Sequence, residues 1–262
     1  LSLYQHFTGN NGEGALLFSA VLHLGTLVAV FIAFRKTICE LLVELFYLIK
    51  DIFTGKFKWK AMNPQRRAII MMVISLAMLI PFYIFKDYFE RAAEDSDIII
   101  EGLCFLYTSV ILFISDRCVK GNKKFGDITT KNAVTVGTFQ GIALLPGISR
   151  SGSTISSGLF CGFERETAVQ YSFILGIPAI LGGCLLQVKD AVEQKALEFD
   201  FVNFAVGFIV SAIVGICAIK MVNWLVKSDK FKVFAIYTFI LGIAVIGIGI
   251  FCLLYTSPSP RD

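Results

Sequence analysis

Apolar residues fill six windows of this chain, and each window is about as long as a helix that crosses a membrane. Such a helix needs about 20 mainly apolar residues, because each residue adds a rise of about 1.5 Å. The pattern predicts spans near residues 15–34, 67–86, 98–115, 168–188, 201–219 and 233–254. We therefore expect an all-α polytopic membrane protein, with residues 1–254 forming a single integral membrane domain.

A further apolar stretch, residues 38–53, is interrupted by charges. Glu40 and Glu44 lie four residues apart and fall on one face of a helix, whereas Leu and Phe side chains fall on the other face. Lys50 and Asp51 add further charge near its end. This pattern is typical of an amphipathic helix that lies in the membrane interface and does not cross it.

Composition supports the membrane class. Hydrophobic residues make up 56% of the 262 residues, with 25 Phe, which exceeds the usual content of a water-soluble domain. The seven cysteines form no C-x-x-C pair and lie mostly in apolar runs, so we interpret them as small core residues rather than zinc ligands or disulfides. The polar tail, residues 255–262, is excluded from the fold and could be foreign to the protein.

The charges between the windows predict the orientation of the chain. Basic residues in short loops are retained on the cytoplasmic side of a membrane, and acidic residues count for little. Three connecting segments are mainly basic, whereas residues 87–97 and 189–200 are mainly acidic. The basic segments, which we place inside, are residues 35–66, 116–131 and 220–232.

This orientation requires residues 132–163 to enter the membrane and return to the same side. The two apolar parts, Asn132–Leu145 and Ser153–Phe163, are each too short to span alone. Pro146, Gly147 and Gly152 interrupt helical structure between them. We expect two half-helices that meet at a turn inside the protein, where a cavity satisfies the irregular backbone. The alternative is an ordinary exposed loop.

A cation, Arg150, lies in this predicted turn. A charge at membrane depth costs several kcal/mol or more, so it is usually kept for a partner. Hydroxyl groups of Ser149, Ser151, Ser153 and Thr154 surround it in the sequence, and a half-helix beginning near Ser153 would direct its free N–H groups to the same place. Guanidinium, hydroxyls and a helix N-terminus together predict a site for a phosphate or pyrophosphate.

The stretch from Phe139 to Ser156, FQGIALLPGISRSGSTIS, resembles the second signature, P-G-x-S-R-S-G-x-T, of the undecaprenyl pyrophosphate phosphatases, which are bacterial membrane enzymes of the bacitracin-resistance type. The resemblance covers nearly the whole chain up to about residue 254. It extends through residues 24–30, 172–178, 204–208, 218–220 and 234–237. The fold of that family resembles an inverted repeat, an architecture with its site at the repeat interface.

The resemblance implies hydrolysis of undecaprenyl pyrophosphate to the monophosphate, which recycles the lipid carrier for cell-wall synthesis in the bacterial inner membrane. Arg150, Ser149 and Ser151 would then be the catalytic residues. The substrate-binding residues would be Gly147, Gly152, Ser153, Thr154 and, in a supporting role, Gln140.

The sequence departs from the family at the first signature, E-x-x-x-E followed by P-V-S-S-x-G-H, which has no counterpart in residues 1–262. Neither His6 nor His23 lies in such a context, and the remaining carboxylates do not replace it. A weak similarity between Leu24-Gly25 and Leu175-Gly176 would put the equivalent of the Arg150 turn before Leu1.

We therefore expect the acidic half of the site to be missing from this chain. The missing half would contain the nucleophile, the general base and the ligands of a divalent cation, Mg²⁺ or Ca²⁺. The chain by itself should be inactive or weak, with no metal ligand among its residues.

A carrier is the alternative function. Broken helices whose positive ends face an anion would serve a polyprenyl-phosphate or anion transporter, or a flippase, as well as an enzyme. The expected partners are undecaprenyl pyrophosphate and membrane lipids but no nucleic acid, and the sequence leaves a homodimer open.

Overall fold

The computed structural model describes residues 15–55, 62–84, 98–145, 147–193 and 201–256, and the part so described is helical without a strand. The α-helices are α2 (Ala15–Ala33), α3 (Arg35–Phe53), α4 (Pro64–Ala77), α5 (Leu79–Ile84), α7 (Ile98–Asp116), α8 (Thr130–Ile142), α9 (Arg150–Phe160), α10 (Arg165–Glu193), α11 (Phe201–Lys227) and α12 (Lys232–Thr256). A short 3-10 helix, η2 (Phe125–Asp127), precedes α8. The all-α prediction is confirmed.

Five helical stretches are long and apolar enough to cross a membrane: Pro64–Ile84, which joins α4 and α5, then α7, α10, α11 and α12. They coincide with five of the six predicted windows, although α10 and α11 extend further than predicted. The sixth window is α2, which meets α3 at a bend of 92°. The chain is therefore a multi-pass membrane protein, with up to six spans in the part that the structure describes.

Helix α3 is the predicted amphipathic helix, and it turns away from the direction of α2. Its acidic face lies against the start of α4, where Arg66 contacts the carboxylates of Glu44 at 3.1 Å and Asp51 at 2.7 Å. Its outer face is apolar and exposed, as at Phe46 and Phe53. An apolar outer face beside a charged inner face suits the boundary between headgroups and acyl chains.

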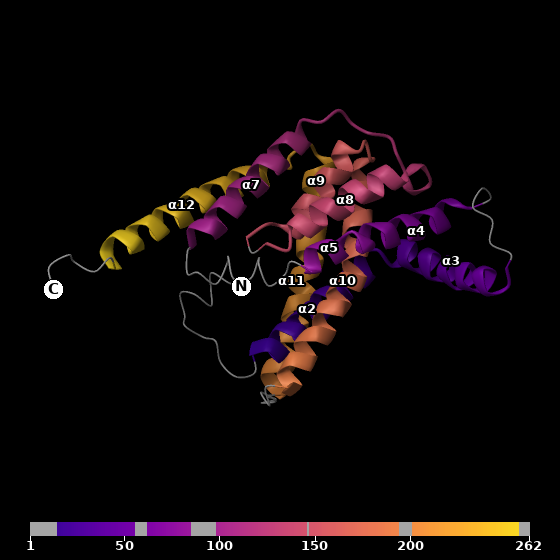
Figure 1. Ribbon diagram of the computed structural model, residues 1–262, viewed down its shortest axis with the longest axis horizontal. Helices are drawn as coiled ribbons and strands as arrows, with labels where there is room; N and C mark the ends of the chain where they lie inside the picture. The colour runs from indigo at the N-terminus through magenta and orange to yellow at the C-terminus, as the bar shows by residue number, and fades with distance from the viewer. Residues whose placement is uncertain (1–14, 56–61, 85–97, 146, 194–200, 257–262) are drawn as a thin grey trace.

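The helices form three groups that meet at the α8–α9 pair (Figure 1). Helices α7 and α12 lie side by side as one arm, while α2 packs against α10 and α11. Helices α3 and α4 form the third group. Helix α9 contacts α7, α8 and α10, and α8 contacts α4, so the pair joins all three groups.

A buried hydrogen-bond network fixes one of these junctions. The hydroxyl of Ser75 on α4 donates to the carbonyl of Ala133 on α8 at 2.8 Å. The same hydroxyl lies 2.9 Å from the hydroxyl of Tyr171 on α10, whose ring packs against Phe163 in the hydrophobic core. Three helices are therefore held in register by groups that water does not reach.

Helices α8 and α9 form a hairpin whose two ends lie at one place, as the predicted re-entrant segment requires. The amine of Lys123 donates to the carbonyl of Cys161 after α9 at 2.8 Å and lies 3.5 Å from Asn132 in the first turn of α8. The backbone N–H of Glu164 also donates to the carbonyl of Lys123. The hairpin therefore begins and ends beside Lys123, and its entry into the membrane stays a prediction.

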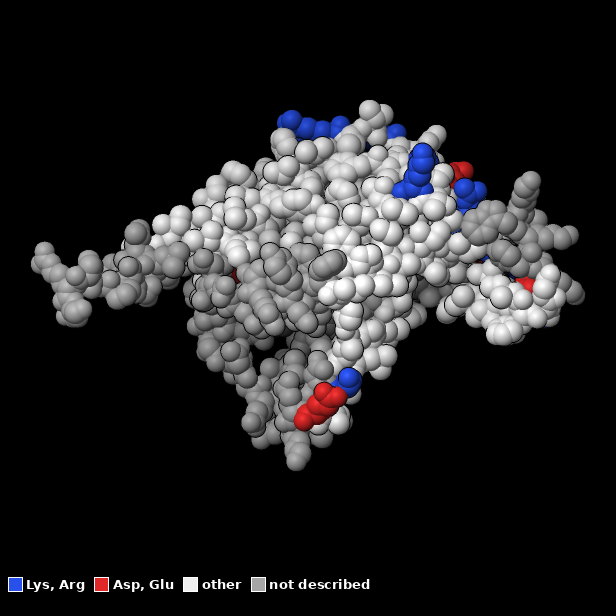
Figure 2. Space-filling model, viewed as in Figure 1, with Lys and Arg blue, Asp and Glu red and all other residues white. Residues whose placement is uncertain are grey.

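The predicted orientation of the chain stays a prediction. Figure 2 shows Lys and Arg along the upper edge, a mostly uncharged middle, and acidic side chains beside a basic one at the lower tip. Arg165, at the start of α10, joins the inner ends of α7 and α11 through Asp116 and the carbonyl of Val226. Several predicted features lie outside the described residues: His6 and the opening stretch, Pro146, the acidic segment 87–97, most of 189–200, and residues 257–262 of the tail.

Candidate anion-binding site

The turn between α8 and α9 positions Arg150 as the first residue of α9. Ser149 is the N-cap, and its hydroxyl accepts a hydrogen bond from the N–H of Gly152 at 3.1 Å. The predicted start near Ser153 is therefore wrong by three residues, because Ser149 is a preferred capping residue and begins the helix earlier. Arg150 therefore belongs to the first turn of α9 and does not precede it.

Gly147 gives this turn its shape. Its φ of +88° is a conformation that other residues rarely adopt. A Cβ at this position would lie 2.9 Å from the carbonyl oxygen of Glu101 and 3.0 Å from the Cβ of Cys104, both on α7. The turn therefore needs glycine for its backbone angle and for its close approach to α7.

Helix α9 is held on two sides by hydroxyl groups. Towards α7, the N–H of Ser149 donates to the hydroxyl of Thr108 at 3.2 Å, and the hydroxyl of Ser156 donates to Ser115 at 3.1 Å. Towards α10, the hydroxyls of Thr154 and Ser172 form a short hydrogen bond. Because these contacts flank the first turn, the backbone that carries Arg150 is fixed before any ligand binds.

Arg150 lines a cavity of about 340 Å³ between α2, α9, α10 and α11. Among the described residues, no hydrogen bond or ion pair to its guanidinium is found. The Cα of Gly176 on α10 leaves space beside it, since a Cβ there would lie 3.5 Å from a guanidinium nitrogen. An arginine without a protein partner in a cavity retains five N–H donors for a ligand.

The structure brings some of the predicted site residues together and separates others. Arg150, Ser151 and Thr154 line the cavity. Ser149 and Gly152 form the cap of α9, and Gly147 forms the turn against α7, so these three shape the site without lining the cavity. The roles assigned to all of them stay predictions.

Gln140 and Ser153 are buried, with 2% and 0% of their surface exposed, and neither lines the cavity. The amide nitrogen of Gln140 and the hydroxyl of Ser153 have no hydrogen-bond partner among the described residues. Buried polar groups are nearly always paired, so these two are exceptions. Both residues lie close to the turn in the sequence, and both retain a free hydrogen-bonding group.

Several lining residues come from other helices and were not predicted as site residues. Thr26 and Val30 belong to α2, Phe173 and Gly176 to α10, and Gly215 to α11. A signal existed for Gly176, Thr26 and Val30, which lie in the stretches 172–178 and 24–30 that resemble the phosphatase family. Gly215 lies outside these stretches, and the packing of α11 against α2 brings it to the cavity.

The lining does not fit a divalent cation by itself. Mg²⁺ and Ca²⁺ are bound mainly by carboxylate and carbonyl oxygens, and no Asp or Glu lines this cavity. Among the described residues, no group of three His, Cys, Asp or Glu side chains lies together. Glu166 forms an ion pair with Lys227 at 3.0 Å, and Glu101, whose carbonyl oxygen faces Gly147, does not line the cavity. The described lining therefore carries one cation and no carboxylate.

The sequence of this chain matches a known protein family. Residues 1–244 match the family model described as bacitracin resistance protein BacA. The chain is 34% identical over 246 residues to the undecaprenyl-diphosphatase of Alkaliphilus metalliredigens (strain QYMF), which covers 94% of this chain and 89% of that protein.

Two further relatives carry similar names. Undecaprenyl-diphosphatase 4 of Bacillus thuringiensis subsp. konkukian (strain 97-27) is 36% identical over 235 residues, covering 89% of this chain and 83% of the relative. The undecaprenyl-diphosphatase of Methanosphaera stadtmanae is 37% identical over 238 residues, covering 89% and 84%. With its signature turn folded around an unpaired arginine, this chain belongs to the BacA family of bacitracin resistance proteins.

Proposed function

We propose that this protein is an undecaprenyl pyrophosphate phosphatase, which hydrolyses the pyrophosphate of the lipid carrier to the monophosphate and inorganic phosphate. The observation that carries the proposal is Arg150, an arginine within the membrane domain that faces a cavity without an ion pair among the described residues. Membership of the BacA family, with relatives named undecaprenyl-diphosphatase, supports the substrate.

The described residues would bind the pyrophosphate and stabilise its charge. Phosphoryl transfer depends mainly on positioning and on stabilising the charge of the phosphoryl oxygens. The guanidinium of Arg150 can hold two of these oxygens at once, and the hydroxyl of Ser151 lines the same cavity. The N-terminus of α9, an 11-residue helix, adds free N–H groups and a partial positive charge at the same place.

The proposal also includes a divalent cation, Mg²⁺ or Ca²⁺, on the resemblance to the family alone. It assigns no step to that ion, since the described lining has no carboxylate to hold it. Titrating a chelator against activity, followed by adding back each metal, tests this part separately.

The proposed location is the bacterial inner membrane, where the lipid carrier is recycled, and the proposed partners are that carrier and the surrounding lipids. The mass of the solubilised protein, measured by light scattering, decides between one copy and a homodimer.

Phosphate release in detergent tests the reaction. The substrate is undecaprenyl pyrophosphate, or farnesyl pyrophosphate as a shorter analogue, with Mg²⁺ present. The assay uses the 262-residue chain, the same chain preceded by a segment that carries the family's first signature, and the Arg150→Ala form of the more active of the two. We expect Arg150→Ala to lower the rate by about 10³-fold, as removing an essential charge-stabilising arginine does.

Arg117→Ala is the matched control. Arg117 is an exposed arginine whose guanidinium lies over the ring of Phe113 at 4.0 Å, outside the cavity. It should leave the rate unchanged. Full activity of Arg150→Ala would reject the role of the turn. Movement of lipid across vesicles, without phosphate release from either form of the chain, would support the carrier instead.

A further inference from the structure

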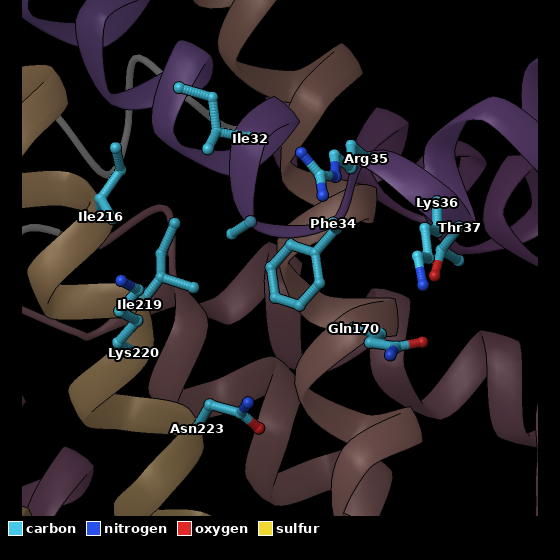
Figure 3. A pocket seen from close by; sticks show the side chains of 11 residues that line it. Ile32, Phe34, Arg35, Lys36, Thr37, Gln170, Ile216, Ile219, Lys220 and Asn223 are labelled. Carbon is cyan, nitrogen blue, oxygen red and sulfur yellow. The ribbon is translucent and has the colours of Figure 1, made fainter.

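A second cavity, of about 480 Å³, lies where the bend between α2 and α3 meets α10 and α11 (Figure 3). Arg35 and Lys36 line it from the first turn of α3, Gln170 from α10, and Lys220 and Asn223 from α11. In Figure 3, the ring of Phe34 lies between the side chains of α3 and those of α11. The proposed phosphatase reaction takes place in the other cavity and does not use this one.

The lining carries three cations and no carboxylate. Among the described residues, no ion pair is found for Arg35, Lys36 or Lys220. Other cations of the inner face do form ion pairs: Lys227 contacts Glu166 at 3.0 Å, and Lys120 contacts Asp229 at 2.7 Å. Like charges that are gathered without a counter-ion repel each other, so this cavity favours an anionic ligand.

Neutral donors add to the three charges. The N-cap residue of α3, Phe34, has no side-chain cap hydrogen bond, so no side chain covers the first N–H groups of this 19-residue helix. Those groups and the positive end of the helix dipole belong to the residues that line the cavity. The amide of Asn223 lines the opposite wall. The arrangement offers a phosphate several donors from two sides.

The cavity lies at the level expected for lipid headgroups on the inner side. It begins where α2 ends and the interfacial helix α3 starts, within the segment whose basic residues predict the cytoplasmic face. Its apolar wall comes from Ile32, Ile216 and Ile219, and Ile32 remains 52% exposed. A ligand with a phosphate at one end and hydrocarbon at the other would contact both kinds of wall.

An aromatic pair separates this cavity from the one around Arg150. Phe34 lines the second cavity and stacks on Phe173, which lines the first, with ring centroids 5.7 Å apart. Ile219 contributes to both linings. The two cation-bearing cavities are therefore neighbours, with apolar side chains between them.

We propose that the cavity formed by Arg35, Lys36, Lys220 and Asn223 binds the phosphate group of an anionic phospholipid from the inner leaflet. The binding is independent of the proposed phosphatase reaction, and the apolar side chain of Ile219 is the lining residue that it shares with the Arg150 cavity. Each basic residue near an anionic lipid surface contributes about 1 kcal/mol, so two of them account for roughly a ten- to thirty-fold change in affinity.

Native mass spectrometry of the detergent-solubilised protein tests the proposal by counting bound lipid. The probe is dioleoyl phosphatidylglycerol, and dioleoyl phosphatidylcholine and inorganic phosphate serve as competitors. The test variant is Arg35→Gln with Lys220→Gln, and the control is Lys131→Gln with Lys232→Gln. All four residues are exposed, and the control pair lies outside the cavity.

We expect the test variant to bind phosphatidylglycerol roughly ten- to thirty-fold more weakly than the wild-type chain. The control should stay within about twofold, since it removes the same charge elsewhere. The exchange Arg35→Lys with Lys220→Arg should keep most of the affinity, which separates loss of charge from a general disturbance of the fold.

Equal binding by the test and control variants would overturn the proposal. Displacement of the lipid by millimolar inorganic phosphate would show that free phosphate is the ligand, and would overturn the lipid assignment. Equal competition by phosphatidylcholine would show that acyl chains and not the anionic headgroup decide binding, and would also overturn it.

Discussion

Two arginines begin two successive helices, and their surroundings differ in every respect that matters for a charge. Arg165 starts α10, and its guanidinium contacts the carboxylate of Asp229 at 2.7 Å and the carbonyl of Val226 at 3.0 Å. Arg150 starts α9 and faces a cavity, with no partner for its guanidinium among the described residues. The two residues therefore share their type and their position in the helix. They differ because the described residues provide hydrogen-bond acceptors for the guanidinium of Arg165 and none for that of Arg150.

The difference separates structural from ligand-binding arginines on physical grounds. A buried charge is tolerated when hydrogen bonds and opposite charges replace the water that it loses. Around Arg165 the protein supplies that replacement, and the result is a link between the inner ends of α7, α10 and α11. Around Arg150 the described residues supply a turn held by hydrogen bonds and open space, which is the arrangement that the proposed binding of a pyrophosphate requires.

The largest expected effect distinguishes the two residues by activity. Arg150→Lys should lower phosphate release by about 10²-fold or more, because an ammonium group cannot hold two phosphate oxygens in one plane. Arg165→Lys should leave the rate per folded molecule within about twofold, because Arg165 lies outside the cavity. Initial rates, corrected for folded protein by size-exclusion chromatography, measure both. Similar losses in both variants would remove the distinction.

The next effect distinguishes them by stability. Arg165→Met should lower the free energy of unfolding by about 1–3 kcal/mol, because it removes the cation 4.0 Å from the carboxylate of Asp116, which keeps the N–H of Phe231 as a donor at 3.0 Å. Asp116 has only 7% of its side chain exposed. Arg150→Met should leave the apparent melting temperature unchanged or raise it, since it removes an unpaired charge. Thermal melting of both variants in one detergent compares them, and the reverse order would contradict the assignment.

A smaller effect concerns pH. The hydrogen bond from Lys120, helped by the charge of Arg165, holds the pKa of Asp229 below its usual value. A carboxylate whose pKa is lowered by folding stabilises the protein above the unfolded pKa, near 4, and loses that contribution as pH falls through the folded pKa. The melting temperature of Asp229→Asn should therefore lie below that of the wild type at pH 6.

The difference should shrink as pH falls to and below about 4. Asn suits the backbone at this position, where φ is +55°, so the substitution changes the charge with little strain. A difference in melting temperature that stays constant from pH 6 to pH 3 would mean that Asp229 contributes through shape and not through charge.

The smallest effect concerns the ion pair between Glu166 and Lys227, whose side chains are 51% and 43% exposed. Exposed pairs contribute about 0–1 kcal/mol. Glu166→Gln should therefore change the melting temperature by about one degree or less, and should change activity no more than Arg165→Lys does. A large loss of activity would make Glu166 a functional residue.

The sequence predicted the path of the chain because that path follows from the length of apolar windows and the sign of loop charges. Both are properties of single segments, since a helix must be long enough to cross and basic loops stay inside. The hairpin of residues 132–163 followed from the same two rules, and Lys123 joins its two ends as that topology requires.

The cavity could be predicted only in part, because its walls come from four helices that are distant in the sequence. The polar wall of the cavity, formed by Arg150, Ser151 and Thr154, could be recognised because these residues lie in one stretch of the sequence. Gly215 became part of the site only through packing between α2 and α11. The start of α9 was misplaced because glycine at position 152 was read as a helix breaker, whereas its N–H is the group that Ser149 caps.

The contacts of Lys123 with both ends of the α8–α9 hairpin fix the position of its base. Because the far end of α9 is fixed there, its 11 residues, at about 1.5 Å each, place Arg150 about 16 Å along the helix from that end. The distance between the cation and the base of the hairpin is thus set by a count of residues. Adding or removing one would change that distance by about 1.5 Å and rotate the guanidinium by about 100°, out of its cavity.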